Sequence, residues 1–135
     1  PYTTLFRSVQ EIVPIISHRT VKQGIRHERL QIISDEALEQ SGGTIRVKIH
    51  APLSLQEALA AFPYQSIVFN PGEENREVLQ VEKTVVMYIG PEGGWSPLDE
   101  SLFKKHATIL RGLGDRILRT ETAAIVGAYE LLWHS

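Results

Sequence analysis

A glycine-rich stretch directly after an apolar run is the part of this sequence best suited to ligand binding. Residues 84–89 read TVVMYI, which is typical of a buried strand, and residues 90–94 continue as GPEGG. In open α/β sheets, ligands bind beyond the carboxyl ends of the strands, where this loop is expected to lie. Its glycines let the backbone approach a ligand closely, although a tight turn is an equally good interpretation. The loop has neither the P-loop nor the GxGxxG spacing, so phosphate binding is not favoured.

A second candidate for chemistry lies in residues 110–124, which read LRGLGDRILRTETAA. Gly112 and Gly114 interrupt a strand-like run. The apolar pair Ile117 and Leu118 then predicts a buried contact just before a helix. A loop of this kind, with glycines on one side and a helix on the other, is able to hold a ligand through its backbone.

Two arginines in this stretch are candidates for contact with a polyanion. Arg116 and Arg119 flank the apolar pair, and Glu121 stands in the first turn of the helix, where the helix dipole favours a carboxylate. In the functional interpretation, the backbone holds a ligand while an arginine meets a negatively charged partner. In the structural interpretation, the arginines pair with Asp115 or Glu121 on the surface. Spacing alone favours the structural one, because exposed arginine pairs are common and contribute little to stability.

Both stretches need a scaffold, and the pattern along the chain predicts one in which strands and helices alternate. Such alternation indicates an α/β fold with a mostly parallel sheet. Ser54 with Glu57, and Ser96 with Asp99, have the spacing of helix-capping boxes, and Gly42 suits a helix end. The expected strands are residues 11–16, 45–49, 66–69, 84–89 and 108–110, and the expected helices are residues 26–41, 54–61, 97–106 and 121–133. Residues 78–81 fit a short helix or a short strand equally well.

The last expected helix is apolar on nearly every side. Ala123, Ala124, Gly127 and Ala128 give it a face of small residues, which permits the close approach of another element. An exposed apolar patch of that size would be a liability on a monomer. The face is therefore expected to be buried in the core, in a subunit interface, or in both.

Composition excludes several classes of function. The chain of 135 residues is 42% hydrophobic, enough for one folded domain, and it has no cysteine, which excludes disulfides, thiolate metal sites and a cysteine nucleophile. The five histidines are scattered without the spacing of metal ligands, so no metal is predicted. No apolar stretch is long enough to span a bilayer, so no membrane is predicted as a partner. The formal net charge of −2 argues against nucleic acid as a partner of this chain by itself.

The two candidate stretches together resemble one known family. IGPEGGW followed by LGDRILRTETA is similar to the RsmE-type family of the SPOUT class, the bacterial methyltransferases that act on N3 of a uracil in 16S ribosomal RNA. Residues 9–20, 39–42 and 52–55 also match comparable stretches of that family, so the resemblance covers nearly all of residues 9–135. It implies a cytoplasmic enzyme with an α/β fold whose C-terminal segment forms a trefoil knot, an exception among folds. It also implies a homodimer through the C-terminal helix.

The resemblance carries roles onto individual residues. It implies that S-adenosylmethionine is held mainly by backbone groups of the two loops. These residues are Ile89, Gly90, Pro91, Glu92, Gly93, Gly94, Leu113, Gly114, Ile117, Leu118 and Arg119. For catalysis, a cation such as Arg119 or Arg116 would stabilise the anionic uracil, and Glu121 would orient the arginine or accept the N3 proton.

The sequence departs from the family in its extent and at three positions. Gly43 stands where an arginine is expected, Asn70 where a histidine is usual, and His18 where an acidic residue is common. Residues 1–8 (PYTTLFRS) are interpreted as a non-native, adaptor-derived segment. Residues 9–135 are interpreted as the methyltransferase domain without its first strand and helix. A PUA-like RNA-binding domain is also expected to be missing, which accounts for the low positive charge.

Three alternatives stay open at this stage. A SPOUT methyltransferase that acts on another RNA is the nearest enzymatic competitor. The second alternative is a non-catalytic fragment that binds the cofactor or RNA. The third is an interaction fragment that folds only on a partner. Whether this chain is active by itself does not follow from its sequence.

Overall fold

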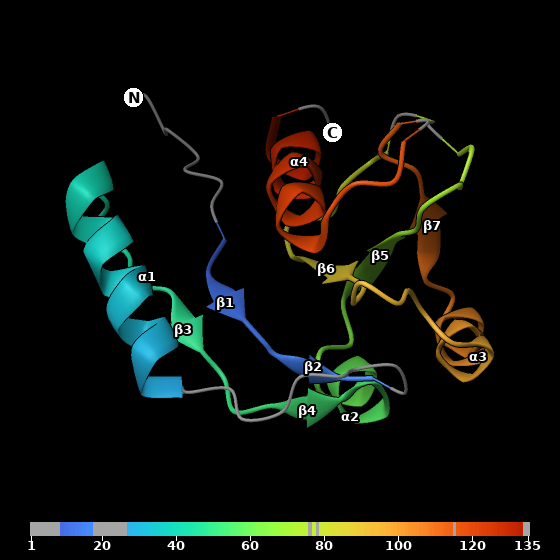
Figure 1. The fold of residues 1–135 in the computed structure, drawn as a ribbon, viewed down its shortest axis with the longest axis horizontal. Helices are drawn as coiled ribbons and strands as arrows, with labels where there is room; N and C mark the ends of the chain where they lie inside the picture. The colour runs from blue at the N-terminus through green and yellow to red at the C-terminus, as the bar shows by residue number, and fades with distance from the viewer. Residues whose placement is uncertain (1–8, 18–26, 76, 78, 115, 134–135) are drawn as a thin grey trace.

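The computed structural model describes most of the chain and places its elements as Figure 1 shows. The predicted non-native segment at residues 1–8 lies outside the described residues, and so does the departure at His18. Two further predictions reach partly outside them, because the first helix was expected from Arg26 and an undecided element from Val78. The described residues are 9–17, 27–75, 77, 79–114 and 116–133.

The central sheet has three parallel strands, and the C-terminal part of its middle strand is buried. β5 (Gln65–Phe69) pairs on one side with β6 (Val85–Ile89) and on the other with β7 (Ile109–Arg111). Within β5, Ile67 and Val68 have no exposed surface, as expected for a strand covered on both faces. Because the strands are parallel and in register, all three end at the same edge of the sheet.

Two shorter parallel pairs continue this arrangement toward the N-terminus. β1 (Glu11–Ile12) pairs with β3 (Lys48–Ile49), and β2 (Ile15–Ile16) pairs with β4 (Leu53–Ser54). Every strand pair among the described residues is parallel, which confirms the predicted α/β fold with a mostly parallel sheet.

The N-terminal strands are shorter than the sequence predicts. The expected strand at 11–16 is split at Val13 and Pro14, because proline has no N–H to donate to a ladder. The expected strand at 45–49 is limited to Lys48 and Ile49, since its partner β1 offers only two residues for pairing. No regular element occurs at the described residues 79–81.

The helices follow their predicted bounds closely because local signals fix their ends. They are α1 (His27–Ser41), α2 (Leu55–Ala61), α3 (Pro97–Lys105) and α4 (Thr120–Trp133). Both predicted capping boxes are present, with Ser54 and Glu57 before α2 and Ser96 and Asp99 before α3. Gly42 ends α1 with a φ of +67°, a conformation that glycine adopts without strain.

Helices cover both faces of the central sheet. On one face, α2 and α3 pack through a core cluster that includes Leu59, Val68 and Phe103. On the other face lies α4 (Figure 1), and its Leu131 packs with Ile67 and Phe69. The alternation of β5 side chains between the two clusters follows from the pleat of the strand. Because the helices cover the two faces, the carboxyl edge of the sheet is occupied by the loops that follow β5, β6 and β7.

α1 lies at the periphery and has no buried residue. It packs on β3, and Arg46 and Asp35 join it to the following segment through two hydrogen bonds of 2.9 Å. The hydrogen bond from the Arg46 guanidinium holds the pKa of the Asp35 carboxyl below its usual value of 3.8. Ile32 and Ile33 are more than half exposed, so α1 contributes little to the core.

Tyr88 supplies a prediction about alkaline stability. Its side chain is 4% exposed, and its hydroxyl has no hydrogen-bond partner among the described residues. Burial raises the pKa of Tyr88 from 10.0 to about 12. The folded state therefore favours the protonated form, so the free energy of unfolding is unaffected below pH 10 and falls by roughly 2–3 kcal/mol as the pH rises through 12.

Tyr88→Phe should remove this loss. At neutral pH we expect equal or slightly higher stability, because the variant no longer buries an unpaired hydroxyl. Above pH 10 the variant should be more stable than the wild type, by a margin that grows toward pH 12. Urea unfolding of both proteins across this range measures the difference, with Tyr64→Phe at a half-exposed tyrosine as the control for loss of a phenol. Parallel pH profiles for wild type and Tyr88→Phe would contradict the prediction.

Candidate ligand-binding site

Three segments meet at the carboxyl edge of the central sheet, directly after its strands. The 70–77 segment follows β5, the 90–95 loop follows β6, and the 112–119 loop follows β7 and leads into α4. The Asn70 N–H donates to the Arg111 carbonyl at 3.0 Å. The Thr120 hydroxyl donates to the Gly90 carbonyl at 3.2 Å. These bonds bring together loops that are far apart in the sequence.

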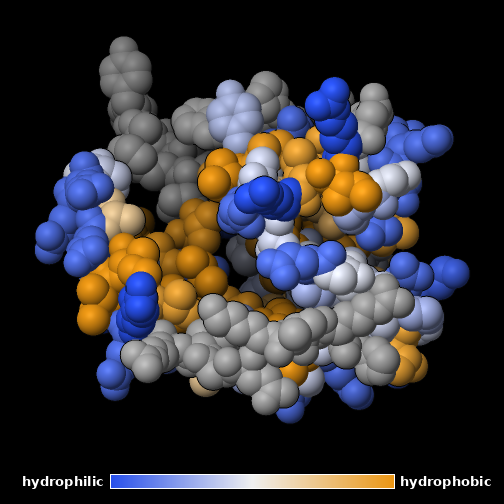
Figure 2. Space-filling view, viewed as in Figure 1, coloured by the Kyte–Doolittle hydropathy of each residue, from blue (hydrophilic) through white to orange (hydrophobic). Residues whose placement is uncertain are grey.

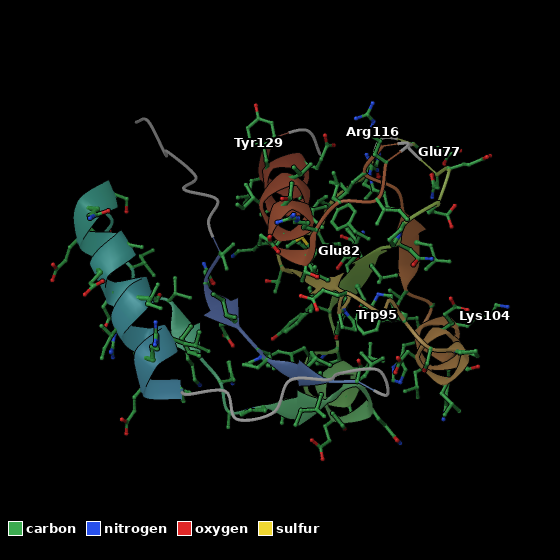
Figure 3. The ribbon with its side chains drawn as sticks, viewed as in Figure 1. Glu77, Glu82, Trp95, Lys104, Arg116 and Tyr129 are labelled. Atoms are coloured by element: carbon green, nitrogen blue, oxygen red, sulfur yellow. The ribbon has the colours of Figure 1, made fainter. Side chains whose placement is uncertain are left out.

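The 90–95 loop is fixed by a turn and by a buried tryptophan. The Gly94 N–H donates to the Pro91 carbonyl at 2.8 Å, and Gly94 has a φ of +74°, which favours glycine. Trp95, which is labelled in Figure 3, is 6% exposed and meets the Phe103 ring edge-on, with ring centroids 4.9 Å apart. A Cβ on Gly90 would lie 3.0 Å from the Trp95 Nε1 atom. Close packing therefore explains Gly90, and turn geometry explains Gly94.

A small cleft opens between the 70–77 segment and the 112–119 loop. The empty space in it, counted together with the open solvent at its mouth, is about 290 Å³. Apolar side chains and a glycine form much of its wall, and the Asn70 amide and the Arg116 guanidinium also line it. The lining residues are Phe69, Asn70, Pro71, Leu113, Gly114, Arg116, Leu118 and Ala123. Of the predicted site residues, Leu113, Gly114, Arg116 and Leu118 thus come together here.

Other predicted site residues lie elsewhere. The glycine-rich stretch from Ile89 to Gly94 does not line this cleft, although the Thr120 bond joins it to the same edge. Within that stretch, Glu92 and Gly93 are exposed, while Ile89 and Pro91 are half-buried. Of the two departures from the family that are described, Asn70 lines the cleft, whereas Gly43 lies just after α1 and does not.

The predicted burial of Ile117 is wrong. Its side chain is 81% exposed, whereas Leu118 is half-buried. Arg116 and Leu118 both line the cleft, so the residue between them projects to the other side, into solvent. The sequence pattern of two adjacent apolar residues could not distinguish their directions, because the segment has no helical or strand period.

The candidate catalytic side chains lie on the surface around the start of α4. Arg116, Arg119 and Glu121 are all exposed, and Arg116 stands at the outer edge in Figure 3. The Arg119 carbonyl accepts the Ala123 N–H at 2.8 Å, which places Arg119 at the helix start. Among the described residues, no ion pair joins Arg116 or Arg119 to a carboxylate. The alternative partner Asp115 lies outside the described residues.

Sequence reasoning missed Arg111, which is buried at the end of β7. Its residue is 8% exposed, its guanidinium donates to the Glu77 carbonyl, and it lies 3.7 Å from a Glu130 carboxylate oxygen of α4. Asn75 strengthens the same junction through two hydrogen bonds. Its side-chain amide donates to the Leu110 carbonyl, and its backbone carbonyl accepts the Gly112 N–H. An arginine between a leucine and a glycine carries no sequence signal for burial, so no pattern could have identified it.

Two classes of feature are absent from the part of the chain that the structure describes. No group of three or more acidic or histidine side chains is arranged to hold a metal ion there. Within those same residues, no helix combines the length and apolar character needed to cross a membrane.

Comparison with known proteins places these features in context. Residues 7–131 match the family model of the RNA methyltransferase domain. The ribosomal RNA small subunit methyltransferase E of Helicobacter pylori strain J99 is 35% identical over 98 residues, which make up 73% of this chain and 42% of that protein.

Solved structures share the fold. A ribosomal RNA small subunit methyltransferase E from Neisseria gonorrhoeae, bound to S-adenosyl methionine, has a TM-score of 0.81 and 30% identity over 92% of this chain and 55% of its own. A Legionella pneumophila protein in complex with bound SAM has a TM-score of 0.84 and 27% identity, covering 90% of this chain and 54% of its own. The chain spans about half the length of the relatives that it matches.

Proposed function

The chain belongs to the RNA methyltransferase domain family, and from this premise we propose that it binds S-adenosylmethionine and methylates N3 of a uridine in small-subunit (16S) ribosomal RNA. The observation that carries the proposal is the meeting of the 90–95 and 112–119 loops at the carboxyl edge of a parallel sheet, tied by Thr120. The similarity to methyltransferases of this kind, one of them bound to S-adenosyl methionine, supports it.

The residues at this edge fit such a cofactor. Phe69, Leu113 and Leu118 give the cleft an apolar wall suited to an adenine ring, and Asn70 adds a polar amide. Gly114 has a φ of +124°, and a Cβ added there would meet only open space, so its backbone is accessible to a ligand. The backbone groups of the predicted residues from Ile89 to Gly94 and from Leu113 to Arg119 would hold the cofactor. When bound, S-adenosylmethionine supplies an electrophilic methyl group on a sulfonium.

The chain's own residues would prepare the uracil. N3 carries a weakly acidic proton that has to leave before or during attack, and the remaining anion needs a cation nearby. Arg119, or Arg116 at the cleft, supplies that positive charge, and both are free of ion pairs with described carboxylates. Glu121 lies two residues from Arg119 in the first turn of α4, where it orients the arginine or accepts the proton.

We also propose that the C-terminal segment forms a trefoil knot. The hydrogen bond between Thr120 and Gly90 supports this idea, because it holds the segment after β7 against the loop after β6. α4 then packs on the sheet through Gly127 and Leu131, and it contacts β6. A knot would lock the two cofactor loops together without any side chain dedicated to that purpose.

A second copy of the chain is the proposed partner of α4. One side of the helix packs on the sheet, but Ile125 is 71% exposed and Tyr129 is 56% exposed on the other. These residues are four apart and share one helix face. Apolar surface gathers over α4 in Figure 2, and Tyr129 points away from the sheet in Figure 3. A homodimer through this face would bury it, as the small-residue composition of α4 also suggests.

Ile125→Glu tests this arrangement. A charge on the outer face of α4 should weaken association at least about tenfold, because a buried unpaired carboxylate is costly. Leu98→Glu, at a leucine of α3 that is 65% exposed, provides a control for placing a carboxylate on an exposed apolar position of another helix. Sedimentation equilibrium measures the dissociation constant of each protein. If wild type and Ile125→Glu associate equally, α4 is not the interface.

Methyl transfer to ribosomal RNA tests the proposed reaction directly. The protein is incubated with unmodified small ribosomal subunits and S-adenosylmethionine labelled on its methyl group, and the RNA is then digested to nucleosides. The expected product is 3-methyluridine from 16S RNA. Label in another RNA would mean that the protein is an RNA methyltransferase with a different substrate. Cofactor binding without any transfer would indicate a non-catalytic binding protein.

A further inference from the structure

The tie between the two loops of the site is a single side chain, and none of the cofactor-binding or catalytic roles proposed above is assigned to it. Thr120 is the first residue of α4, and its hydroxyl donates to the Gly90 carbonyl 30 residues earlier in the chain. The donor–acceptor distance is 3.2 Å, and the contact is partly buried. The hydrogen bond therefore links the start of the last helix to the end of β6.

The position of Thr120 differs from that of the capping serines. Ser54 and Ser96 stand one residue before α2 and α3, where a serine commonly accepts a backbone N–H of its own helix, whereas Thr120 is already inside α4. At α4 the first helical bond runs from the Ala123 N–H to the Arg119 carbonyl, and the Thr120 hydroxyl points to another segment. Its role is thus between loops and not within the helix.

The acceptor of this bond is itself held in place. Gly90 is packed so closely against the Trp95 ring that a Cβ would lie 3.0 Å from Nε1 and 3.1 Å from Cε2. Trp95 is buried and cannot move aside without disturbing Phe103. With the ring on one side and the Thr120 hydroxyl on the other, the Gly90 peptide has little freedom. The rest of the loop then turns through the Gly94–Pro91 bond.

We propose that Thr120 is a positioning residue for the cofactor site. Its hydroxyl fixes the 90–95 loop against the start of α4, so that the cofactor-binding backbone is already formed before a ligand arrives. Because Arg119 and Glu121 are the sequence neighbours of Thr120, the same bond also sets their distance from the 90–95 loop. This inference rests on the proposed function, since it assigns the residue that organises that site.

Thr120→Val and Thr120→Ser separate this role from general stability. Valine keeps the size of threonine but loses the hydroxyl, whereas serine keeps the hydroxyl. In the ligand-free protein, hydrogen exchange at residues 90–94 should become about tenfold faster in Thr120→Val and remain near wild type in Thr120→Ser. Titration with S-adenosylmethionine should show about tenfold weaker binding for the valine variant only. In the methylation assay, KM for the cofactor should rise while KM for RNA stays constant.

Equal exchange and equal cofactor affinity in wild type and Thr120→Val would overturn the inference. So would a loss in Thr120→Ser as large as that in Thr120→Val, because the effect would then not depend on the hydroxyl. If the folded wild type binds no S-adenosylmethionine, the proposed function fails and the positioning role for a cofactor fails with it. The exchange experiment on the ligand-free protein would then decide by itself whether the hydroxyl ties the loops.

Discussion

Arg119→Ala is expected to lower the rate of RNA methylation about a hundredfold to a thousandfold while it changes affinity for S-adenosylmethionine less than about threefold. The physical reason is that the guanidinium would meet charge that develops on the uracil only when the N3 proton leaves. The cofactor contacts proposed for Arg119 are backbone contacts, which alanine retains. Single-turnover methylation and calorimetric titration measure the two quantities separately.

Two further variants make this result specific. Arg29→Ala removes another exposed arginine, in α1 and away from the sheet edge, and should leave the rate unchanged. Arg119→Lys keeps a positive charge but not the planar donor fork, so it should restore part of the rate. Equal losses of turnover and cofactor affinity in Arg119→Ala would contradict a role in the transition state. They would point to a role in binding alone.

Gly127→Val should have the largest effect on stability. A Cβ at this position of α4 would lie 2.7 Å and 2.9 Å from ring carbons of Phe69 and 3.0 Å from the Met87 sulfur. Phe69 is 5% exposed in the core cluster under α4, so its ring has little room to shift. We expect a loss of about 2–3 kcal/mol in the free energy of unfolding, from overpacking of a dense core. Urea denaturation measures this loss.

Thr122→Val is the matched control, because it places the same side chain at an exposed position of the same helix. It should change the free energy of unfolding by less than about 0.5 kcal/mol. Since α4 starts at Thr120, displacement of the helix by Gly127→Val should also weaken cofactor binding. Equal unfolding midpoints for the two variants would mean that α4 does not pack on β5 and β6 as described.

Much of the fold could be predicted because its signals are local. The capping boxes at Ser54 and Ser96, and Gly42 after α1, fixed helix ends through interactions that span only a few residues. Strand lengths at the N-terminus could not be predicted in the same way. Lys48 and Ile49 pair only as far as β1 extends, and that length depends on Pro14, which lies more than thirty residues away in the sequence.

The candidate site could be predicted where its signals are local and could not be predicted where they depend on the folded chain. The two glycine-rich stretches stood out because glycine clusters after strands are a sequence pattern with a known geometry. Thr120 and Arg111 had no such pattern, because their partners, Gly90, Glu77 and Glu130, are defined only by the folded chain. The direction of the Ile117 side chain could not be predicted either, because it depends on which neighbouring residues line the cleft.

The small-residue face of α4 shows an intermediate case. The sequence predicted that the face would be buried in the core, in an interface, or in both. Gly127 packs against Phe69 and Met87 in the core, whereas the exposed apolar side chains Ile125 and Tyr129 lie on another side of the helix. The core half of that prediction is confirmed, and the interface half stays a prediction.

The most direct test of the account is a calorimetric titration of the full chain with S-adenosylmethionine, on a sample shown to be folded by circular dichroism. The account predicts saturable binding of one cofactor per chain, weakened about tenfold in Thr120→Val and unchanged in Arg29→Ala. Binding of this kind would establish that the 90–95 and 112–119 loops form a cofactor site. No heat of binding from a folded sample would contradict the central claim that the carboxyl edge of this sheet is a cofactor site.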